Sequence, residues 1–384
     1  MGVPEKRFIV RVVVWISVVV AMVNLFTHHL CAQTQEPVDA PFLQLKPVAH
    51  KNIVAIMSGN SDGGSLNTIY DIATVLERTS DIRIIPVVGN GSLQNIKDIL
   101  NLDNIDAVII QPHILWHLKE TGEVAPDIDK RIAYITTLFT DELHVIARKE
   151  IKDFKDLAGK RVNFSIKGSG TRISMGLIFN ALQMKVQEFN MRQADAFELM
   201  KQGQLDATSC ICSKPLYHAY MLKNKSKDFK ILSIPYTTEL EENFFPGLVS
   251  HKDYPDLIPP GGSVNTVAVQ TILGIYSGST EKNERYRRLA RFVDAFFNNI
   301  KEFKRPLHHE KWAAVNIAAS VSGLQRFEPA QIWLNRNLLP AGRQVGAVVN
   351  QTTDERIIQS VRRSNVEKAD PQPIQAVPSQ SLPQ

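Results

Sequence analysis

Short apolar runs alternate with amphipathic segments along most of this chain, and no other feature of the sequence restricts the fold as strongly. The runs at 52–59, 82–89 and 105–111 have strand length, and each precedes a segment whose apolar residues recur at helical spacing. Strands that are apolar on both faces belong in a parallel sheet that helices cover on both sides. The pattern therefore predicts an α/β fold.

The same alternation returns in the middle of the chain. Its strand-like runs are 160–166, 185–190, 205–211 and 229–235, and its helical segments are 171–184, 195–204 and 215–224. Between the two blocks, residues 131–149 are β-rich without a helix, and residues 264–276 are again strand-like. A chain that leaves one lobe and later returns to it needs two such crossings.

We therefore expect two lobes with a ligand cleft between them and a hinge that the chain crosses twice. Lobe 1 is expected to comprise residues 51–135 and about 250–335, and lobe 2 residues 136–249. A length of 384 residues suits two units of ordinary size. Two independent α/β domains in series are the alternative.

The N-terminal residues 1–32 have the layout of a secretory signal. Lys6 and Arg7 precede an uncharged apolar run, Val12–Val23, and Ala32 occupies a plausible cleavage position. The run is shorter than the about 20 residues of a membrane span, and an uncleaved anchor is the alternative. We expect an exported, periplasmic protein in which residues 33–50 form a linker and residues 340–384 a disordered polar tail.

Composition and cysteine spacing argue against several functions. The net charge of +5 is mild and spread along the chain, so nucleic acid is not an expected partner. Cys210 and Cys212 are two residues apart, which would strain a mutual disulfide on a strand, and buried, reduced thiols are expected instead. No cluster of cysteine and histidine has zinc spacing, so neither a metal nor another cofactor is expected.

Hydrolase and nucleotide motifs are missing from the sequence. "GNGSL" and "KGSGT" lack the spacing of a nucleophile elbow, and no Gly-Lys-Ser/Thr closes a phosphate loop. His113 and His117 share a helix face but lack the glutamate of a zinc protease motif. We therefore predict no catalytic residue and a protein that is not an enzyme.

Three turns rich in glycine and serine each follow a strand and open a helix: 58–65, 89–92 and 167–171. In a parallel sheet such turns lie at the carboxyl edge of the strands, where ligands bind. The helix starts supply N–H donors and partial positive charge, so the turns can form a pocket for a small carboxylate. For any single turn, helix capping is the simpler interpretation. The expected ligand-facing residues of the first turn are Ser58, Asn60, Gly64 and Ser65.

The order and spacing of "IVAIMSGNSDGGS", "VVGNGSLQN", "VIIQ" and "DLAGKRVNFSIKGSGT" resemble the TAXI class of TRAP-transporter solute receptors, over 52–335. The resemblance implies a two-lobed periplasmic-binding-protein fold of the type II-like kind. It also implies capture of a small organic acid, such as glutamate or a dicarboxylate, for ion-coupled TRAP membrane subunits. By matching position, the ligand-facing residues would be Ser92, Gln111, Ser169, Gly170 and Thr171.

The first turn departs from that family's pattern, because many members have Gly-Thr-Tyr-Tyr where this chain has Gly-Ser-Leu-Asn at 64–67. The missing aromatic residues leave the identity of the acid open. We expect a monomeric clamp that closes when both lobes contact the ligand. Arg172 either supplies charge to the carboxylate or pairs with a nearby acid on the surface.

Two other functions fit the same sequence. An enzyme on this scaffold would have Cys210 or Cys212 as its candidate nucleophile. A receptor that presents its ligand to a membrane sensor would need the same clamp and the same docking face.

Overall fold

The computed structural model describes residues 52–61, 64–216, 221, 227–278 and 283–338. The expected signal at 1–32, linker at 33–50 and tail at 340–384 lie outside these residues, as does most of the expected helix at 215–224. In the described part of the chain, no helix is both long and apolar enough to cross a membrane.

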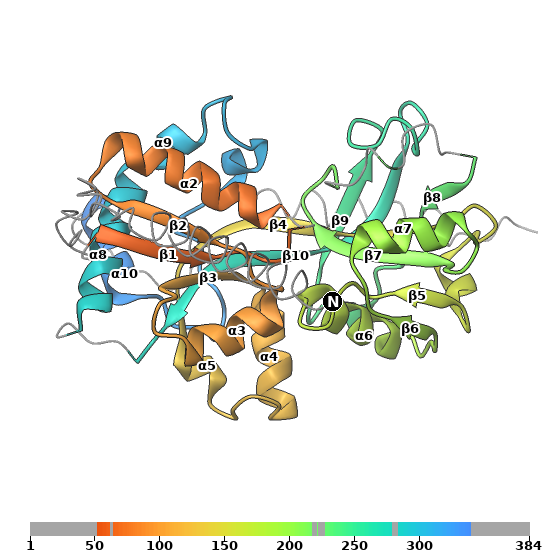
Figure 1. Cartoon of the computed structure of the whole chain (residues 1–384), viewed down its shortest axis with the longest axis horizontal. Helices are drawn as coiled ribbons and strands as arrows, with labels where there is room; N and C mark the ends of the chain where they lie inside the picture. Colours follow the sequence, from red (N-terminus) through yellow and green to blue (C-terminus); the bar gives the residue numbers. More distant parts are fainter. Residues whose placement is uncertain (1–51, 62–63, 217–220, 222–226, 279–282, 339–384) are drawn as a thin grey trace, which may run out of the picture. The chain divides into compact units, whose positions relative to one another are not determined.

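The described residues form one ten-stranded sheet whose main path has the order β2-β1-β3-β10-β4-β7-β5-β6. Two long antiparallel strands, β4 (Ile132–Arg148) and β10 (Ser263–Tyr276), lie at the centre of this order and connect the two halves (Figure 1). The chain therefore passes between the halves on two paired strands. The expected α/β fold with two lobes and a twice-crossed hinge is confirmed.

We call the described residues of 52–140 and 270–338 lobe 1. Its parallel strands pair β1 with β2 on one side and with β3 on the other. The elements of lobe 1 besides parts of β4 and β10 are β1 (Ile53–Met57), α2 (Ser65–Thr79), β2 (Arg83–Val87), α3 (Ser92–Asn101), β3 (Ala107–Ile110), α4 (Pro112–Thr121), α5 (Ile128–Arg131), α8 (Glu284–Asn298), α9 (Ile300–Phe303), the 3-10 helix η6 (Glu310–Ala314) and α10 (Glu328–Asn337).

We call the described residues of 141–269 lobe 2. Here β5 pairs in parallel with β6 and β7, while β8 and β9 are antiparallel partners of β4 and β10. The elements of lobe 2 are η3 (Phe154–Leu157), β5 (Arg161–Asn163), α6 (Gly170–Ala181), β6 (Gln187–Phe189), α7 (Gln193–Lys201), β7 (Ala207–Cys212), β8 (Phe229–Ile231), η5 (Thr238–Leu240) and β9 (Phe245–Ser250).

Strand pairing places the return to lobe 1 later in the chain than the expected position near residue 250. The first half of β10 pairs with β9 in lobe 2, and its second half pairs with β3 in lobe 1. The change of pairing partner from β9 to β3 occurs near Gln270, where the pairing of β10 with β4 also shifts register. Because β10 is continuous across this point, no turn residue marks the lobe boundary in the sequence.

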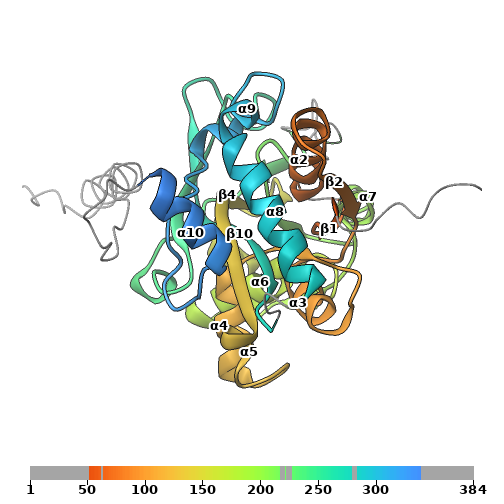
Figure 2. The same cartoon turned by 90° about the vertical axis from the view of Figure 1, so that its left-hand side faces the viewer.

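Helices cover both faces of the sheet in each lobe, as the apolar strands require. In lobe 1, α2 and α8 bury their apolar stripes on one face, and α3 and α4 on the other (Figure 2). In lobe 2, α6 and α7 lie over opposite faces. The sheet edges that carry the strand-to-helix turns of the two lobes consequently face each other near the crossing.

The largest buried side chain of lobe 1 is Trp312, on the short helix η6. Its ring lies 4.7 Å from that of Phe303 and 6.1 Å from that of Phe296, measured between centroids. Its indole N–H donates a hydrogen bond of 2.7 Å to Asp71 on α2. Trp312 therefore helps to fix an otherwise irregular segment onto the lobe, together with His308 and His309, which bind the same carboxylate.

We expect Trp312→Ala to lower the free energy of unfolding by about 3–5 kcal/mol, because it leaves a large cavity and removes one hydrogen bond to Asp71. Chemical denaturation followed by circular dichroism measures this change. Trp333→Ala removes a tryptophan that is only partly buried, and we expect a loss less than half as large. Equal losses in the two variants would contradict the role given to Trp312.

Candidate ligand-binding site

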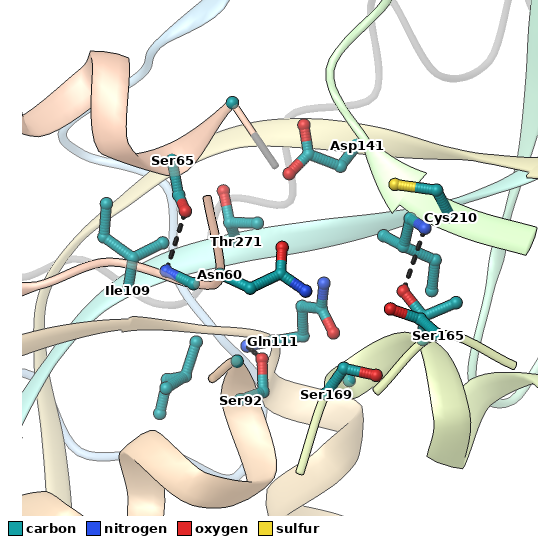
Figure 3. A pocket seen from close by; sticks show the side chains of 17 residues that line it. Asn60, Ser65, Ser92, Ile109, Gln111, Asp141, Ser165, Ser169, Cys210 and Thr271 are labelled. Carbon is teal, nitrogen blue, oxygen red and sulfur yellow. Dashed lines mark hydrogen bonds between the residues drawn. The ribbon is translucent and has the colours of Figure 1, made fainter. Parts of the chain in front are cut away.

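A pocket with about 530 Å³ of empty space, its open mouth included, lies where the two lobes meet (Figure 3). Both lobes and both crossing strands contribute to its wall. The lining residues are Gly59, Asn60, Gly64, Ser65, Gly91, Ser92, Ile109, Ile110, Gln111, Asp141, Ser165, Ser169, Gly170, Thr171, Cys210, Ile211 and Thr271. Eight of the ten residues expected to face a ligand are among them.

Three helices begin at this pocket. α2 starts at Ser65 and α3 at Ser92 in lobe 1, and α6 starts at Gly170 in lobe 2. The first N–H groups of each helix have no acceptor within the helix, and each helix start carries about half a positive charge. The pocket is therefore electrostatically suited to a small anion.

The hydroxyl groups of the three turns hold the neighbouring backbone in place. The oxygen of Ser65 accepts the N–H of Gly59 at 2.8 Å, and that of Thr171 accepts the N–H of Ile211 at 3.0 Å. The oxygen of Ser92 accepts the N–H of Gln111 at 3.1 Å. Each hydroxyl hydrogen has no acceptor within the described residues, so it is available to a ligand oxygen.

The N-cap of α6 is Ser169. Its hydroxyl oxygen accepts the N–H of Arg172 at 3.2 Å. This leaves the N–H groups of Gly170 and Thr171 as the donors at the start of the helix. Capping and ligand binding are thus compatible at this turn, because different groups perform them.

Glycines allow the two lobes to touch beside the pocket. A Cβ atom on Gly170 would lie 1.9 Å from the Oε1 atom of Gln111, and one on Gly64 would lie 2.5 Å from the hydroxyl of Ser213. Both pairs join lobe 1 to lobe 2. The backbone N–H of Gln94 also donates to the carbonyl of Gly168 at 3.1 Å. The structure therefore shows the lobes closed upon each other.

A second contact between the lobes lies between α4 and α6. The Nε2 atom of His113 is 2.7 Å from the hydroxyl of Ser174, and the imidazole lies against the ring of Phe244 at 5.4 Å. Burial, assisted by the charge of His117, lowers the pKa of His113 from 6.5 to about 3. His113 is therefore neutral when the lobes are closed.

Two of the expected site residues lie away from the pocket. Ser58 is buried, and its hydroxyl bonds to the carbonyl oxygens of Gly59 and Val87 at 2.8 and 3.2 Å. Arg172 forms a partly exposed ion pair with Glu188, with 2.9 Å between its Nε atom and the carboxylate. Arg172 thus adopts the surface pairing, the second of its two expected placements.

Asp141 and Thr271, on the two crossing strands, line the pocket although the sequence did not single them out. Thr271 donates its hydroxyl to the carbonyl of Phe139 at 2.7 Å. One feature of the sequence could have identified Asp141: it forms an acidic pair with Glu142 in the middle of an apolar strand. A buried charge at such a position needs a partner or a ligand.

The cysteines are free and buried, as expected. Cys210 lines the pocket, whereas Cys212 points toward His144, with 3.6 Å between its sulfur and the Nδ1 atom. Burial raises the pKa of the Cys212 thiol well above its ordinary value, so it stays protonated. Within the described residues, no group of three or more histidine, cysteine, aspartate or glutamate side chains could hold a metal ion.

The model of the NMT1-like family matches residues 63–315, about two thirds of the sequence. The chain belongs to the NMT1-like family. The match spans both lobes and every described residue of the pocket wall except Gly59 and Asn60.

Several solved structures are similar to this NMT1-like protein. A substrate-binding protein of an ABC uptake transporter from Streptococcus pneumoniae, with bound histidine, is 14% identical with a TM-score of 0.43, over 70% of this chain and 95% of that one. The alkanesulfonate-binding protein SsuA from Xanthomonas axonopodis, bound to MOPS, is 14% identical with a TM-score of 0.41, over 84% and 95%. The aliphatic sulphonate binding protein SsuA from Escherichia coli is 16% identical with a TM-score of 0.37, over 87% and 96%. Such low scores say nothing about the ligand of this chain.

We expect Gly170→Ala to favour the open form, because the new methyl group would occupy the space of the Gln111 side chain. Overpacking of this kind costs about 1–3 kcal/mol, enough to lower the ratio of closed to open molecules about fivefold or more. Small-angle X-ray scattering would show a larger radius of gyration than in the wild type. Gly176→Ala is the matched control on the same helix, because nothing lies within 4 Å of its added Cβ. An equal radius in the two variants would contradict the contact.

We expect acid to destabilise the closed protein through His113. Between pH 6.5 and the lowered pKa of about 3, the unfolded chain binds more protons than the folded one, so stability rises with pH in that window. Lowering the pH from 7 to 5 should remove about 2 kcal/mol through this group. Urea unfolding at both pH values measures the difference, which should shrink in His113→Gln and persist in His117→Gln. An unchanged difference in His113→Gln would refute the assignment.

Proposed function

We propose that this protein is an exported solute-binding receptor that captures a small organic anion between its lobes. The observation that carries the proposal is the convergence of three helix starts, from both lobes, on one small pocket. The carboxylate of the ligand would accept hydrogen bonds from the N–H groups of Gly170 and Thr171. The starts of α2 and α3 would act on it from the other lobe.

Helix starts are sufficient to hold such an anion without a basic side chain. Each contributes about 0.3–1 kcal/mol at an exposed site and up to about 2 kcal/mol when partly buried. Because α6 and α3 belong to different lobes, only closure lets both act on the same carboxylate. Ligand binding would therefore shift the population toward the closed form.

The alternative of an enzyme with a cysteine nucleophile has less support from the pocket. Cys212 is protonated and packs against His144, and the same buried His144 is the cross-strand neighbour of Cys210, with a pKa that burial lowers to about 4. A thiol needs a lowered pKa or an adjacent base to become a nucleophile. The polar groups of the pocket are better suited to holding a ligand than to activating a sulfur atom.

We further propose that the receptor delivers its ligand to TRAP-type membrane subunits, because the order of its motifs resembles the TAXI class. The closed clamp would be the form that docks. A membrane sensor would use the same closed form, and binding assays with candidate membrane subunits distinguish the two partners.

The proposal is tested by native mass spectrometry of protein purified without unfolding, which should detect a bound small acid. Titration calorimetry with that acid should then show at least a tenfold loss of affinity in Thr171→Val, which removes a hydroxyl at the start of α6. Arg172→Ala is the control, because its side chain is paired with Glu188 outside the pocket. We expect its affinity to stay within about threefold of the wild type.

If the acid binds Thr171→Val as tightly as the wild type, the start of α6 does not hold it. If no small acid co-purifies or binds at all, the protein is not a receptor for organic anions.

A further inference from the structure

Asp141 is the one charged residue among the described residues that line the pocket. It lies on β4 at the crossing between the lobes, and 8% of its side chain is exposed. In Figure 3 its carboxylate lies on the same side of the pocket as Thr271, and Ser169 lies on the opposite side. A negative charge thus faces a pocket whose helix starts attract negative charge.

The carboxylate of Asp141 is only half satisfied by the protein. Its Oδ1 atom accepts hydrogen bonds from Ser213 at 3.0 Å and from Lys311 at 3.1 Å. Its Oδ2 atom has no hydrogen-bond partner within the described residues. The side chain is nearly buried as a whole, so a further donor from a ligand would stabilise this carboxylate.

A second acceptor in the same pocket also lacks a donor. The Oε1 atom of Gln111 is buried and has no hydrogen-bond partner among the residues that the structure describes. Gln111 comes from lobe 1 and extends into the middle of the pocket in Figure 3. The pocket therefore offers two kinds of surface to a ligand: N–H and O–H donors at the helix starts, and unpartnered acceptors at Asp141 and Gln111.

Lobe 1 contacts Asp141 through Lys311, the sequence neighbour of the buried Trp312. The Nζ atom of Lys311 lies 3.1 Å from Asp141 and 2.9 Å from Glu142. Burial alone would lower the pKa of Lys311, but the two carboxylates outweigh it and the pKa is raised. Glu142 is also paired with Lys214 at 3.1 Å, so the two lysines balance the two carboxylates of the cluster. The remaining acceptor capacity of Asp141 is directed at the pocket.

We propose that Asp141 is a specificity-determining residue that selects ligands whose carboxylate is accompanied by a positively charged amino group. This inference rests on the proposed function of a receptor for small organic anions. The carboxylate of the ligand lies at the helix starts, and its ammonium group donates to Asp141 Oδ2 and Gln111 Oε1. An ammonium has three donors, enough for both acceptors. A dicarboxylate would place its second negative charge against Asp141, and like charges at close range repel.

The test compares L-alanine, L-valine and L-leucine with the 2-hydroxy acids of the same side chains and with malonate, succinate and glutarate. Titration calorimetry uses the full chain after dialysis to remove bound solute. For the wild type we expect at least one amino acid to bind at least tenfold more tightly than its hydroxy acid and than every dicarboxylate. In Asp141→Asn this preference should fall below about threefold, because the amide cannot balance the ammonium charge.

Glu142→Gln is the matched control. Glu142 binds the same Lys311 but does not line the pocket, so this variant disturbs the ion cluster without changing the surface that faces a ligand. We expect it to keep the preference for amino acids. Loss of the preference in both variants would show that the cluster acts on folding alone and would overturn the proposal.

Other outcomes separate this inference from the function on which it rests. Tight binding of a dicarboxylate or a hydroxy acid by the wild type, weakened in Thr171→Val, would overturn the role of Asp141 and leave the receptor intact. If Asp141→Asn keeps the full preference for amino acids, the role of Asp141 is likewise overturned and the receptor function stands. Binding of none of these probes, together with no co-purified acid, would overturn both.

Discussion

The antiparallel pairing of β4 with β10 is the constraint on which the rest of the structure depends. Each strand belongs to both lobes, so the two halves of the sheet cannot move independently of these two strands. Their pairing changes register near Gln270, beside the point where Asp141 and Thr271 reach the pocket. The crossing between the lobes is therefore also part of the pocket wall.

The close contact between the lobes depends on two glycines. Gly64 and Gly170 occupy positions where a Cβ atom would overlap the opposite lobe. Because these two glycines have no side chains, the starts of α2, α3 and α6 can lie close together around the pocket. The pocket then presents backbone N–H groups from both lobes, and Asp141 is the one acidic side chain among its described lining residues.

Much of the fold and part of the site could be predicted from the sequence. The helices that begin at Ser65 and Ser92 start where the first two glycine- and serine-rich turns end, as expected, because local spacing and turn residues determine them. Local pattern placed the second lobe boundary near residue 250, whereas strand pairing places it near Gln270. Pairing partners along a continuous strand are a property of the sheet, and no residue of β10 marks the change.

The sequence by itself determined the alternation of strands and helices and the glycine-rich turns at the edges of the sheet. Hydrophobic period and backbone freedom act over a few residues, so they can be read along the chain. Only the tertiary structure decided that Arg172 turns to Glu188, that Gln111 meets Gly170, and that Asp141 faces the pocket. The first two contacts join residues that are 16 and 59 positions apart. They depend on strand register and on the angle between the lobes, which local patterns do not encode.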